Sequence, residues 1–234
     1  MRLPLRATQR GRLLRRYKRF FADVETPEGE VLTVHCPDPG SMRGVLRDRA
    51  AVRCSRSDAP HRKLAHTLEM IRSGRIWVGV HTALANRLVE RVLEGGAYPP
   101  LAGYARVRRE VRAGESRLDF RLEGHPHDPR PAWVEVKSVT LAAGARARFP
   151  DSVTARGRRH VDELLRLHRQ GDRAVLLYLV QRADCDRVEP ADDIDPAYAS
   201  ALRAAAKGGV EVHALRARVT PTEIRSECPL PVVL

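Results

Sequence analysis

The chain has 234 residues, 43% of them hydrophobic and 30% charged, and a formal net charge of +13. This length suits one large domain or two small ones, and the composition excludes a disordered or low-complexity chain. No run of about 20 apolar residues occurs, which excludes a membrane-spanning helix, and arginines interrupt the N-terminal segment too often for a signal peptide. We therefore expect a cytoplasmic protein that does not associate with membranes.

The positive charge is concentrated toward the N-terminus. Residues 1–84 contain 17 Lys or Arg against 8 Asp or Glu, whereas residues 85–234 contain 25 against 21. A preference for arginine codons would explain a high arginine content, but it would not explain this asymmetry. Because a cluster of cations neutralises phosphates and releases their counterions, we predict that the chain binds DNA.

The first third has the pattern of a series of short strands. Alternating or β-branched segments occur at residues 12–25, 31–36, 51–57, 66–73 and 75–80, with a turn-forming Pro-Asp-Pro-Gly sequence at 37–40. Five short strands followed closely by turns predict a small closed barrel. The five-stranded OB-fold fits this pattern, and an SH3-like barrel fits it nearly as well. We place the boundary before residue 83, so that residues 1–82 form an OB-like domain that binds nucleic acid.

Basic and aromatic side chains are interleaved at the start of this domain. The candidate nucleic-acid contacts here are Arg15, Arg16, Tyr17, Lys18 and Arg19. Aromatic rings stack on the bases of a single strand, and neighbouring cations hold its phosphates. Aromatic residues make up only 5% of the chain, so we expect phosphate contacts to dominate and the sequence preference to be weak.

The rest of the chain mixes helical and strand patterns. Residues 83–93 have apolar positions at helical spacing and precede Gly95 and Gly96, which are residues that end helices. Strands are predicted at 106–111, 116–123, 132–140, 174–182 and, as the last one, 210–219, and helices at 156–171 and 195–209. This order predicts an α/β domain with a mixed central sheet over residues 83–234. The whole chain is then an α+β protein of two domains.

Two of these strands carry a candidate catalytic group. Period-two alternation places Leu118 and Phe120 on one face of the first strand and Asp119 on the other. In the second strand Glu135 and Lys137 share a face. A hairpin between the strands would bring Asp119 beside Glu135. Two neighbouring carboxylates repel each other unless a cation lies between them. Mg²⁺ and Mn²⁺ prefer carboxylate oxygen atoms as ligands.

The spacing Asp-x15-Glu-x-Lys matches the PD-(D/E)xK nuclease pattern. A divalent ion held by Asp119 and Glu135 would lower the pKa of a bound water and stabilise charge on a phosphate, while Lys137 orients or deprotonates that water. Taken alone, the Glu-x-Lys part also fits a surface ion pair on an exposed strand. The Asp within the apolar alternation of the preceding strand favours the nuclease interpretation.

Longer segments resemble a known family. These are HCPDPGSM (35–42), GESRLDF (114–120), WVEVKSVTL (133–141), FPDSVTARGRRHVDELLRL (149–167) and AVLLYLVQR (174–182), which together resemble the sugar fermentation stimulation protein (SfsA) family. The resemblance implies a DNA-binding protein with an OB-type domain joined to a PD-(D/E)xK nuclease-like domain. It also implies that Asp119, Glu135 and Lys137 are the metal-binding and catalytic positions. Where the family usually has Asn-Thr, this chain has Asp38-Pro39.

Further site residues follow from the likeness to this nuclease superfamily. A helical glutamate often completes the metal site, which suggests Glu90, and the carbonyl oxygen of Val136 is the expected third ligand. The segment that opens the helix after residue 155 offers Arg156, Arg158, Arg159 and His160 as contacts to nucleic acid. For Glu90 the alternative is a solvated helix position, and for His160 it is packing.

Two other functions remain open. A DNA-binding regulator of sugar (maltose-type) metabolism, without hydrolytic activity, would keep the three residues for binding metal or phosphate. A metal-dependent enzyme acting on a small anionic metabolite would leave the basic N-terminus without a role. DNA or RNA, in single-stranded, duplex or branched form, is compatible with the pattern. Nucleases of this superfamily often cut as dimers, which implies a homodimer as one assembly.

Overall fold

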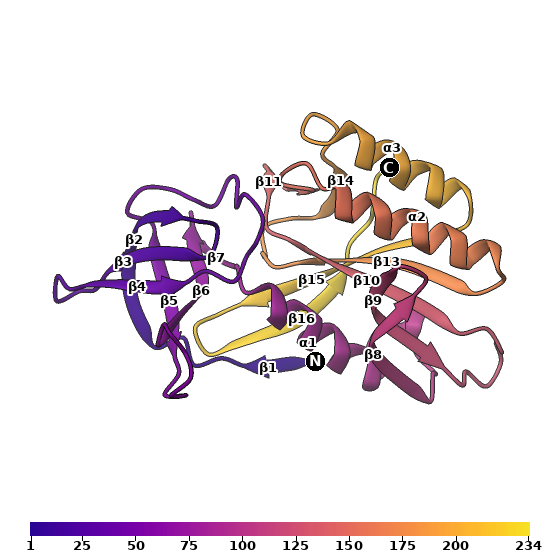
Figure 1. The fold of residues 1–234 in the computed structure, drawn as a ribbon, viewed down its shortest axis with the longest axis horizontal. Coiled ribbons are helices and arrows are strands. Elements are labelled where there is room, and N and C mark those ends of the chain that lie inside the picture. Colours follow the sequence, from indigo (N-terminus) through magenta and orange to yellow (C-terminus); the bar gives the residue numbers. More distant parts are fainter.

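The computed structural model describes residues 1–234, which fold into a β-barrel and a helix-covered sheet (Figure 1). The barrel strands are β2 (Gln9–Tyr17), β3 (Phe21–Glu25), β4 (Val31–His35), β5 (Ala51–Arg56), β6 (His66–Ser73) and β7 (Ile76–Gly79). They lie in the order β4-β3-β2-β5-β6-β7, and β4 also pairs with β6 at His35 and Thr67. This pairing closes β2 to β6 into a five-stranded barrel, the number that the sequence predicts. The predicted fifth strand, at 75–80, is β7 and lies outside the closure, whereas the predicted first strand forms both β2 and β3.

The expected single strand over residues 12–25 is wrong, because the chain turns back after Tyr17. Lys18 and Arg19 have positive φ angles of 45° and 62°, and β2 pairs antiparallel with β3, with Tyr17 opposite Phe21. Left-handed residues in tight hairpin turns are usually Gly, Asn or Asp. None of these occurs at the turn, so the sequence gives no signal for it. The turn places two cations at the tip of a hairpin.

The second unit is built on the mixed sheet that the sequence predicts. Its seven strands lie in the order β1 (Arg2–Pro4), β16 (Glu223–Pro229), β15 (Glu211–Val219), β13 (Arg173–Val180), β10 (Ala132–Val139), β9 (Ser116–Glu123) and β8 (Arg106–Ala113). The β10–β13 and β13–β15 pairs are parallel, and the other pairs are antiparallel. A small second sheet contains β11 (Ala142–Ala143), β12 (Arg146–Phe149) and β14 (Arg187–Pro190).

Two strands of the large sheet differ from the prediction. The last strand is β16 rather than the segment 210–219, which forms β15. The first residues form β1, in which Leu3 lies opposite Ile224 of β16 and is buried. Residues 2–4 thus belong to the sheet of the second unit, although the expected first domain begins at residue 1. Three residues are too few to show strand periodicity, which explains why the sequence pattern does not reveal them.

Different helices cover the two faces of the large sheet. Helix α1 (Thr82–Glu94), followed by the 3-10 helix η1 (Pro99–Leu101), packs on one face, where Leu88 and Val92 join a buried cluster. Helices α2 (Ala155–Arg169) and α3 (Pro196–Lys207) cover the other face, and Figure 1 shows them side by side. None of the helices has the length and apolarity needed to span a bilayer.

The alternation of side chains holds in β10 but not in β9. In β10, Val134 packs on the α1 side, while Glu135 points to α2. In β9, Leu118 lies in the cluster under α2 and α3, whereas Phe120 lies in the cluster under α1. The expectation that Leu118 and Phe120 share a face is therefore wrong. The change of face occurs at Asp119, between them, and this local irregularity positions its carboxylate.

Hydrogen bonds fasten the barrel to the second unit at three places along their seam. They run from Gly79 N to Gln181 O (2.9 Å), from Thr82 Oγ1 to Pro37 O (3.0 Å), and from Ser41 Oγ and Met42 N to the carbonyl and Oδ2 of Asp151 (2.6 and 2.7 Å). Asp151 thus joins the two units, a role that its sequence position does not suggest. The loop 37–42 is held against the second unit on both sides.

The loop that carries the unusual Asp38-Pro39 pair is also held from within the barrel. Arg16 donates to the carbonyl oxygens of Asp38 and Gly40, each at 2.8 Å. The Asp38 side chain accepts a hydrogen bond from Gly40 N at 2.8 Å and is almost fully buried. Burial, together with the nearby charge of Asp151, raises the pKa of Asp38 to about 6.

Replacing Arg16 with Ala is expected to lower the free energy of unfolding by about 2 kcal/mol, because two carbonyl oxygens of the loop lose a charged donor. Chemical denaturation followed by fluorescence would measure this change. The matched control is Arg12→Ala on the same strand, since Arg12 makes one exposed hydrogen bond, to Arg49 O at 3.1 Å. Equal stability of the two variants would contradict a structural role for Arg16.

Candidate active site

A cavity of about 530 Å³ lies between the barrel and the sheet, and both units line it. The barrel contributes Arg19, Asp38, Pro39 and Gly40, and helix α1 contributes Thr82, Ala83 and Asn86. Strands β9 and β10 contribute Asp119, Glu135, Val136, Lys137 and Ser138. Most of the other lining residues lie in the segment 148–156. All three residues of the predicted Asp-Glu-x-Lys group therefore face one cavity. The seam between the two units, rather than one unit alone, forms the site.

Asp119 lies at the point where β9 and β10 separate. Their last paired residues are Phe120 and Val134. Beyond this pair, Asp119 Oδ2 accepts a hydrogen bond from Val136 N at 2.8 Å, and Oδ1 accepts one from Asn86 Nδ2 at 2.6 Å. The Asp119 carboxylate thus accepts the hydrogen bond that Val136 N of β10 would otherwise give to a neighbouring strand. This bond fixes the carboxylate beside Glu135.

Glu135 is buried, with 3% of its surface exposed. Its Oε1 atom accepts hydrogen bonds from Lys137 Nζ at 2.7 Å and from His160 Nδ1. Its Oε2 atom is also buried, yet it has no hydrogen-bond partner. A buried carboxylate oxygen without a donor is costly, and such atoms are rare in folded proteins. A cation at Oε2 would remove this cost.

The two carboxyl groups have opposite pKa shifts. Burial and the neighbouring charge of Glu135 raise the pKa of Asp119 to about 7. Burial alone would also raise the pKa of Glu135, but Lys137 and His160 outweigh it, so that this pKa lies below its usual value. Glu135 is therefore ionised at neutral pH, while Asp119 is partly protonated. A divalent cation between them would favour the ionised form of both.

These residues fit Mg²⁺ or Mn²⁺ better than they fit zinc. No group of three or more His, Cys, Asp or Glu side chains is arranged to hold a metal. Two carboxylates with one unpartnered oxygen suit Mg²⁺ or Mn²⁺, because these ions commonly take one or two carboxylates and complete their shell with water or phosphate. Val136, whose carbonyl oxygen is the expected third ligand, lines the same cavity.

Glu90, the expected helical ligand, lies outside the cavity and is engaged elsewhere. Its Oε2 accepts a hydrogen bond from Arg109 Nη1 on β8 at 3.1 Å. The residue of α1 that contacts the carboxylates is Asn86, one turn earlier, through its bond to Asp119. Sequence reasoning missed Asn86. The four-residue spacing from Glu90 could have suggested it, because positions i and i+4 share a helix face.

Four of the five candidate contacts in the barrel are engaged within the chain, although Arg19 makes only one exposed bond, to Pro39 O. Arg15 pairs with Asp23 at 2.7 Å, and the Tyr17 hydroxyl contacts the same carboxylate at 3.2 Å. The Tyr17 ring also stacks on Phe21, with 5.6 Å between ring centroids. Arg16 holds the loop 37–41, as described above. Each of these side chains would have to exchange a partner in order to bind nucleic acid.

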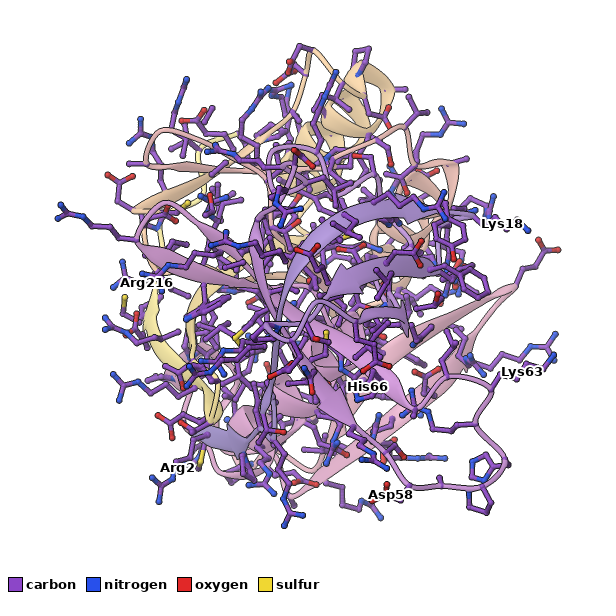
Figure 2. All side chains as sticks on the ribbon, turned by 90° about the vertical axis from the view of Figure 1, so that its left-hand side faces the viewer. Arg2, Lys18, Asp58, Lys63, His66 and Arg216 are labelled. Atoms are coloured by element: carbon purple, nitrogen blue, oxygen red, sulfur yellow. The ribbon has the colours of Figure 1, made fainter.

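The two cations of the hairpin turn are the better placed candidates. Lys18 is exposed and has no side-chain partner, and Arg19 lines the cavity while donating to Pro39 O at 3.2 Å. Figure 2 shows Lys18 at the same edge of the barrel as Lys63, away from Arg2. Two lysines thus lie at this edge of the barrel, in the part of the chain where the sequence concentrates positive charge.

The candidates on α2 divide into surface and buried residues. Arg158 and Arg159 are exposed and have no side-chain partner, and Arg156 lines the cavity. His160 is 5% exposed, so it is not available as a surface contact. Its Nε2 atom accepts a bond from Arg156 Nε at 3.4 Å. Because Arg156 can only donate, the proton of the imidazole lies on Nδ1 and is donated to Glu135.

Comparison with known proteins agrees with this architecture. Residues 14–80 match the SfsA N-terminal OB domain, and residues 83–223 match the sugar fermentation stimulation protein RE domain. The first match confirms the OB-like barrel over the SH3-like alternative. The chain is 50% identical to the sugar fermentation stimulation protein homolog of Geobacter metallireducens, over 100% of both chains. It is 52% identical to that of Halorhodospira halophila, over 94% of this chain and 93% of the relative.

A solved structure extends the comparison to three dimensions. The structure of Pyrococcus furiosus SfsA, in complex with Ca²⁺, superposes with a TM-score of 0.88 at 27% sequence identity. The match covers 97% of this chain and 96% of that chain, so it includes the barrel, the sheet and the seam between them. The chain therefore belongs to the sugar fermentation stimulation protein (SfsA) family.

Proposed function

We propose that this protein binds DNA and cleaves its phosphodiester bonds with Mg²⁺ or Mn²⁺ at the cavity between its two units. The observation that carries the proposal is the buried, unpartnered Oε2 of Glu135 beside Asp119, whose pKa is raised to about 7. The Pyrococcus furiosus protein was solved in complex with Ca²⁺, which supports a divalent metal site in the family. The OB domain and the net charge of +13 support nucleic acid as the partner.

Each residue of the site has a distinct role in this proposal. Asp119 and Glu135 hold the ion, together with the carbonyl oxygen of Val136. When bound, the ion would act as a Lewis acid on the phosphate and on the attacking water. Lys137, held 2.7 Å from Glu135, carries a positive charge beside the reacting phosphate and orients the water. Arg156 places a guanidinium at the cavity wall for a neighbouring phosphate.

Cleavage and binding must be measured side by side. Labelled single-stranded, duplex and forked DNA, and RNA of the same sequence, would be incubated with Mg²⁺ or Mn²⁺, and binding would be followed separately with Ca²⁺. Metal-dependent cleavage would support the nuclease. Binding with no cleavage of any substrate would reject it in favour of a DNA-binding regulator. Binding to none of the nucleic acids would reject both and favour a small anionic substrate.

His160 is expected to position Glu135 so that Oε2 is free for the metal. Removing a group that orients a metal ligand typically costs tenfold to a hundredfold in metal affinity or activity, and we expect this for His160→Ala. Asn places an amide nitrogen at the position of Nδ1, whereas Gln places it at that of Nε2. His160→Asn should therefore restore most of the Mn²⁺ affinity measured by calorimetry, and His160→Gln should not. Equal affinities for the Asn and Gln variants would contradict this role.

A further inference from the structure

A second crevice, of about 390 Å³, lies along the same seam. The barrel lines it with Gly44 and Arg47 of the loop after β4 and with Gly74 and Arg75 of the turn between β6 and β7, and the second unit lines it with Ala142, Gly144, Arg182 and Asp184. None of the residues assigned above to metal binding, catalysis or nucleic-acid contact lies here. The crevice is therefore distinct from the active-site cavity.

The crevice carries uncompensated positive charge. Arg182 is 6% exposed and is fully used, because it donates to both carboxylate oxygens of Asp184 (2.7 and 2.8 Å) and to Thr140 O (2.8 Å). Arg47 and Arg75 are exposed, and neither forms an ion pair or a side-chain hydrogen bond. Two unpaired arginines thus line a crevice in which the one carboxylate, Asp184, is already paired with Arg182, and this surplus of guanidinium groups suits phosphate.

Two glycine turns border the crevice. Gly74 and Gly144 have positive φ angles of 55° and 61°, and a Cβ atom at either position would meet no atom within 4 Å. Gly74 belongs to the barrel and Gly144 to the second unit, so the space is free on both sides of the seam.

One extended segment connects the crevice to the active-site cavity. Thr140 and Leu141 line the cavity, whereas Ala142 and Gly144 line the crevice. On the barrel side, the Cβ of a residue in place of Gly44 would lie 3.2 Å from Leu141 Cδ1, so the loop after β4 lies beside Leu141 at this junction. Four residues of extended chain span roughly 13 Å, a distance of only a few phosphates along one nucleic-acid strand.

We propose that a single nucleic-acid strand lies along this seam, with one phosphate at Asp119 and Glu135 and phosphates a few nucleotides away held by Arg47 and Arg75. This placement rests on the proposed function. The strand is single because the bonds of Ser41 and Met42 to Asp151 fasten the units across the seam. A duplex would have to separate the two units before its phosphate could reach Glu135.

The test is fluorescence anisotropy with a labelled single strand of about 12 nucleotides and the matching blunt duplex, in Ca²⁺. The double variant Arg47→Ala/Arg75→Ala is compared with Arg169→Ala/Lys207→Ala, which removes the same charge from the exposed ends of α2 and α3. We expect about tenfold weaker binding of the single strand by the first variant. The slope of log K against log salt should fall by about 1.4, since two phosphate contacts are lost at about 0.7 each.

The outcomes separate this inference from the proposed nuclease. Equal affinity and salt slope for the two double variants, or a duplex bound by the wild type as tightly as the single strand, would overturn the strand path. Single-strand binding that depends on Arg47 and Arg75, with no metal-dependent cleavage of any substrate, would support the path while rejecting the nuclease. Thermal melting of both variants would verify folding, which we expect because all four side chains are exposed.

Discussion

Replacing Glu135 with Gln is expected to lower the rate of metal-dependent DNA cleavage by about a thousandfold, while DNA binding and folding are retained. Gln preserves the shape of the side chain, and its oxygen can still accept the hydrogen bonds that Lys137 and His160 give to Oε1. It replaces the unpartnered Oε2 by an amide group. The change thus removes the negative charge and one metal-binding oxygen but leaves the packing of α2 on β10.

Single-turnover rates at saturating enzyme would measure this loss, because they report the chemical step separately from product release. The matched control is Glu115→Gln, an exposed residue in the turn between β8 and β9 that alters the net charge by the same amount. Undiminished cleavage by the Glu135 variant would exclude this cavity as the catalytic centre. Its DNA affinity should stay within about twofold of the wild type, since the barrel and the basic loops are unchanged.

The central part of the site could be predicted because it depends on short-range geometry. Asp119, Glu135 and Lys137 lie on two neighbouring strands, and the alternation of β10 places the last two on one face. A turn-rich connection then brings β9 beside β10. The exact orientation of Asp119 could not be predicted, because it depends on a change of face between Leu118 and Phe120 that interrupts the alternation.

The remaining site residues come from elements that only the tertiary fold brings together. His160 contacts a carboxylate 25 residues away, and Asn86 contacts one 33 residues away. The sequence shows which helix face each residue occupies, but not which strand that face meets. The same limit applies to Arg16, which has the composition of a phosphate contact and instead holds loop carbonyls. Net charge identifies a basic surface, whereas the partner of each arginine depends on the fold.

The barrel shows the corresponding limit for secondary structure. Five-stranded closure followed from the number and spacing of short strands, but the hairpin at Lys18 and Arg19 lacks the residues that usually mark such a turn. The contribution of residues 2–4 to the other sheet also lacks a local signal, because a three-residue edge strand is defined by its partner β16. The positions of most strands and helices were therefore predicted well, and isolated turns and edges were not.

Asp119 is expected to make both stability and metal binding depend on pH near neutrality. Its pKa in the folded protein is about 7, against an ordinary value of 3.8. In the absence of metal, the folded state retains a proton that the unfolded state has lost. The contribution of Asp119 to stability is thus fully present below pH 4 and is lost as the pH rises to about 7. This pKa shift corresponds to a decrease in the free energy of unfolding on the order of 4 kcal/mol.

A divalent ion should reverse this loss, because it binds the ionised carboxylate. We expect the apparent dissociation constant for Mn²⁺ to rise about tenfold for each pH unit below 7, and to be nearly constant above it. Calorimetric titration and thermal melting between pH 5.5 and pH 8.5 would measure both effects.

Asp38, with a pKa of about 6, adds a stability change of the same sign, so the Asp119→Asn variant is needed to isolate the contribution of Asp119. In that variant the metal-free protein should lose the part of the stability change between pH 4 and pH 7 that Asp119 causes, and Mn²⁺ should no longer raise the melting temperature. A wild-type Mn²⁺ affinity that is independent of pH across this range would show that Asp119 is not a ligand, because a carboxyl group with this pKa must release its proton before it can bind the ion.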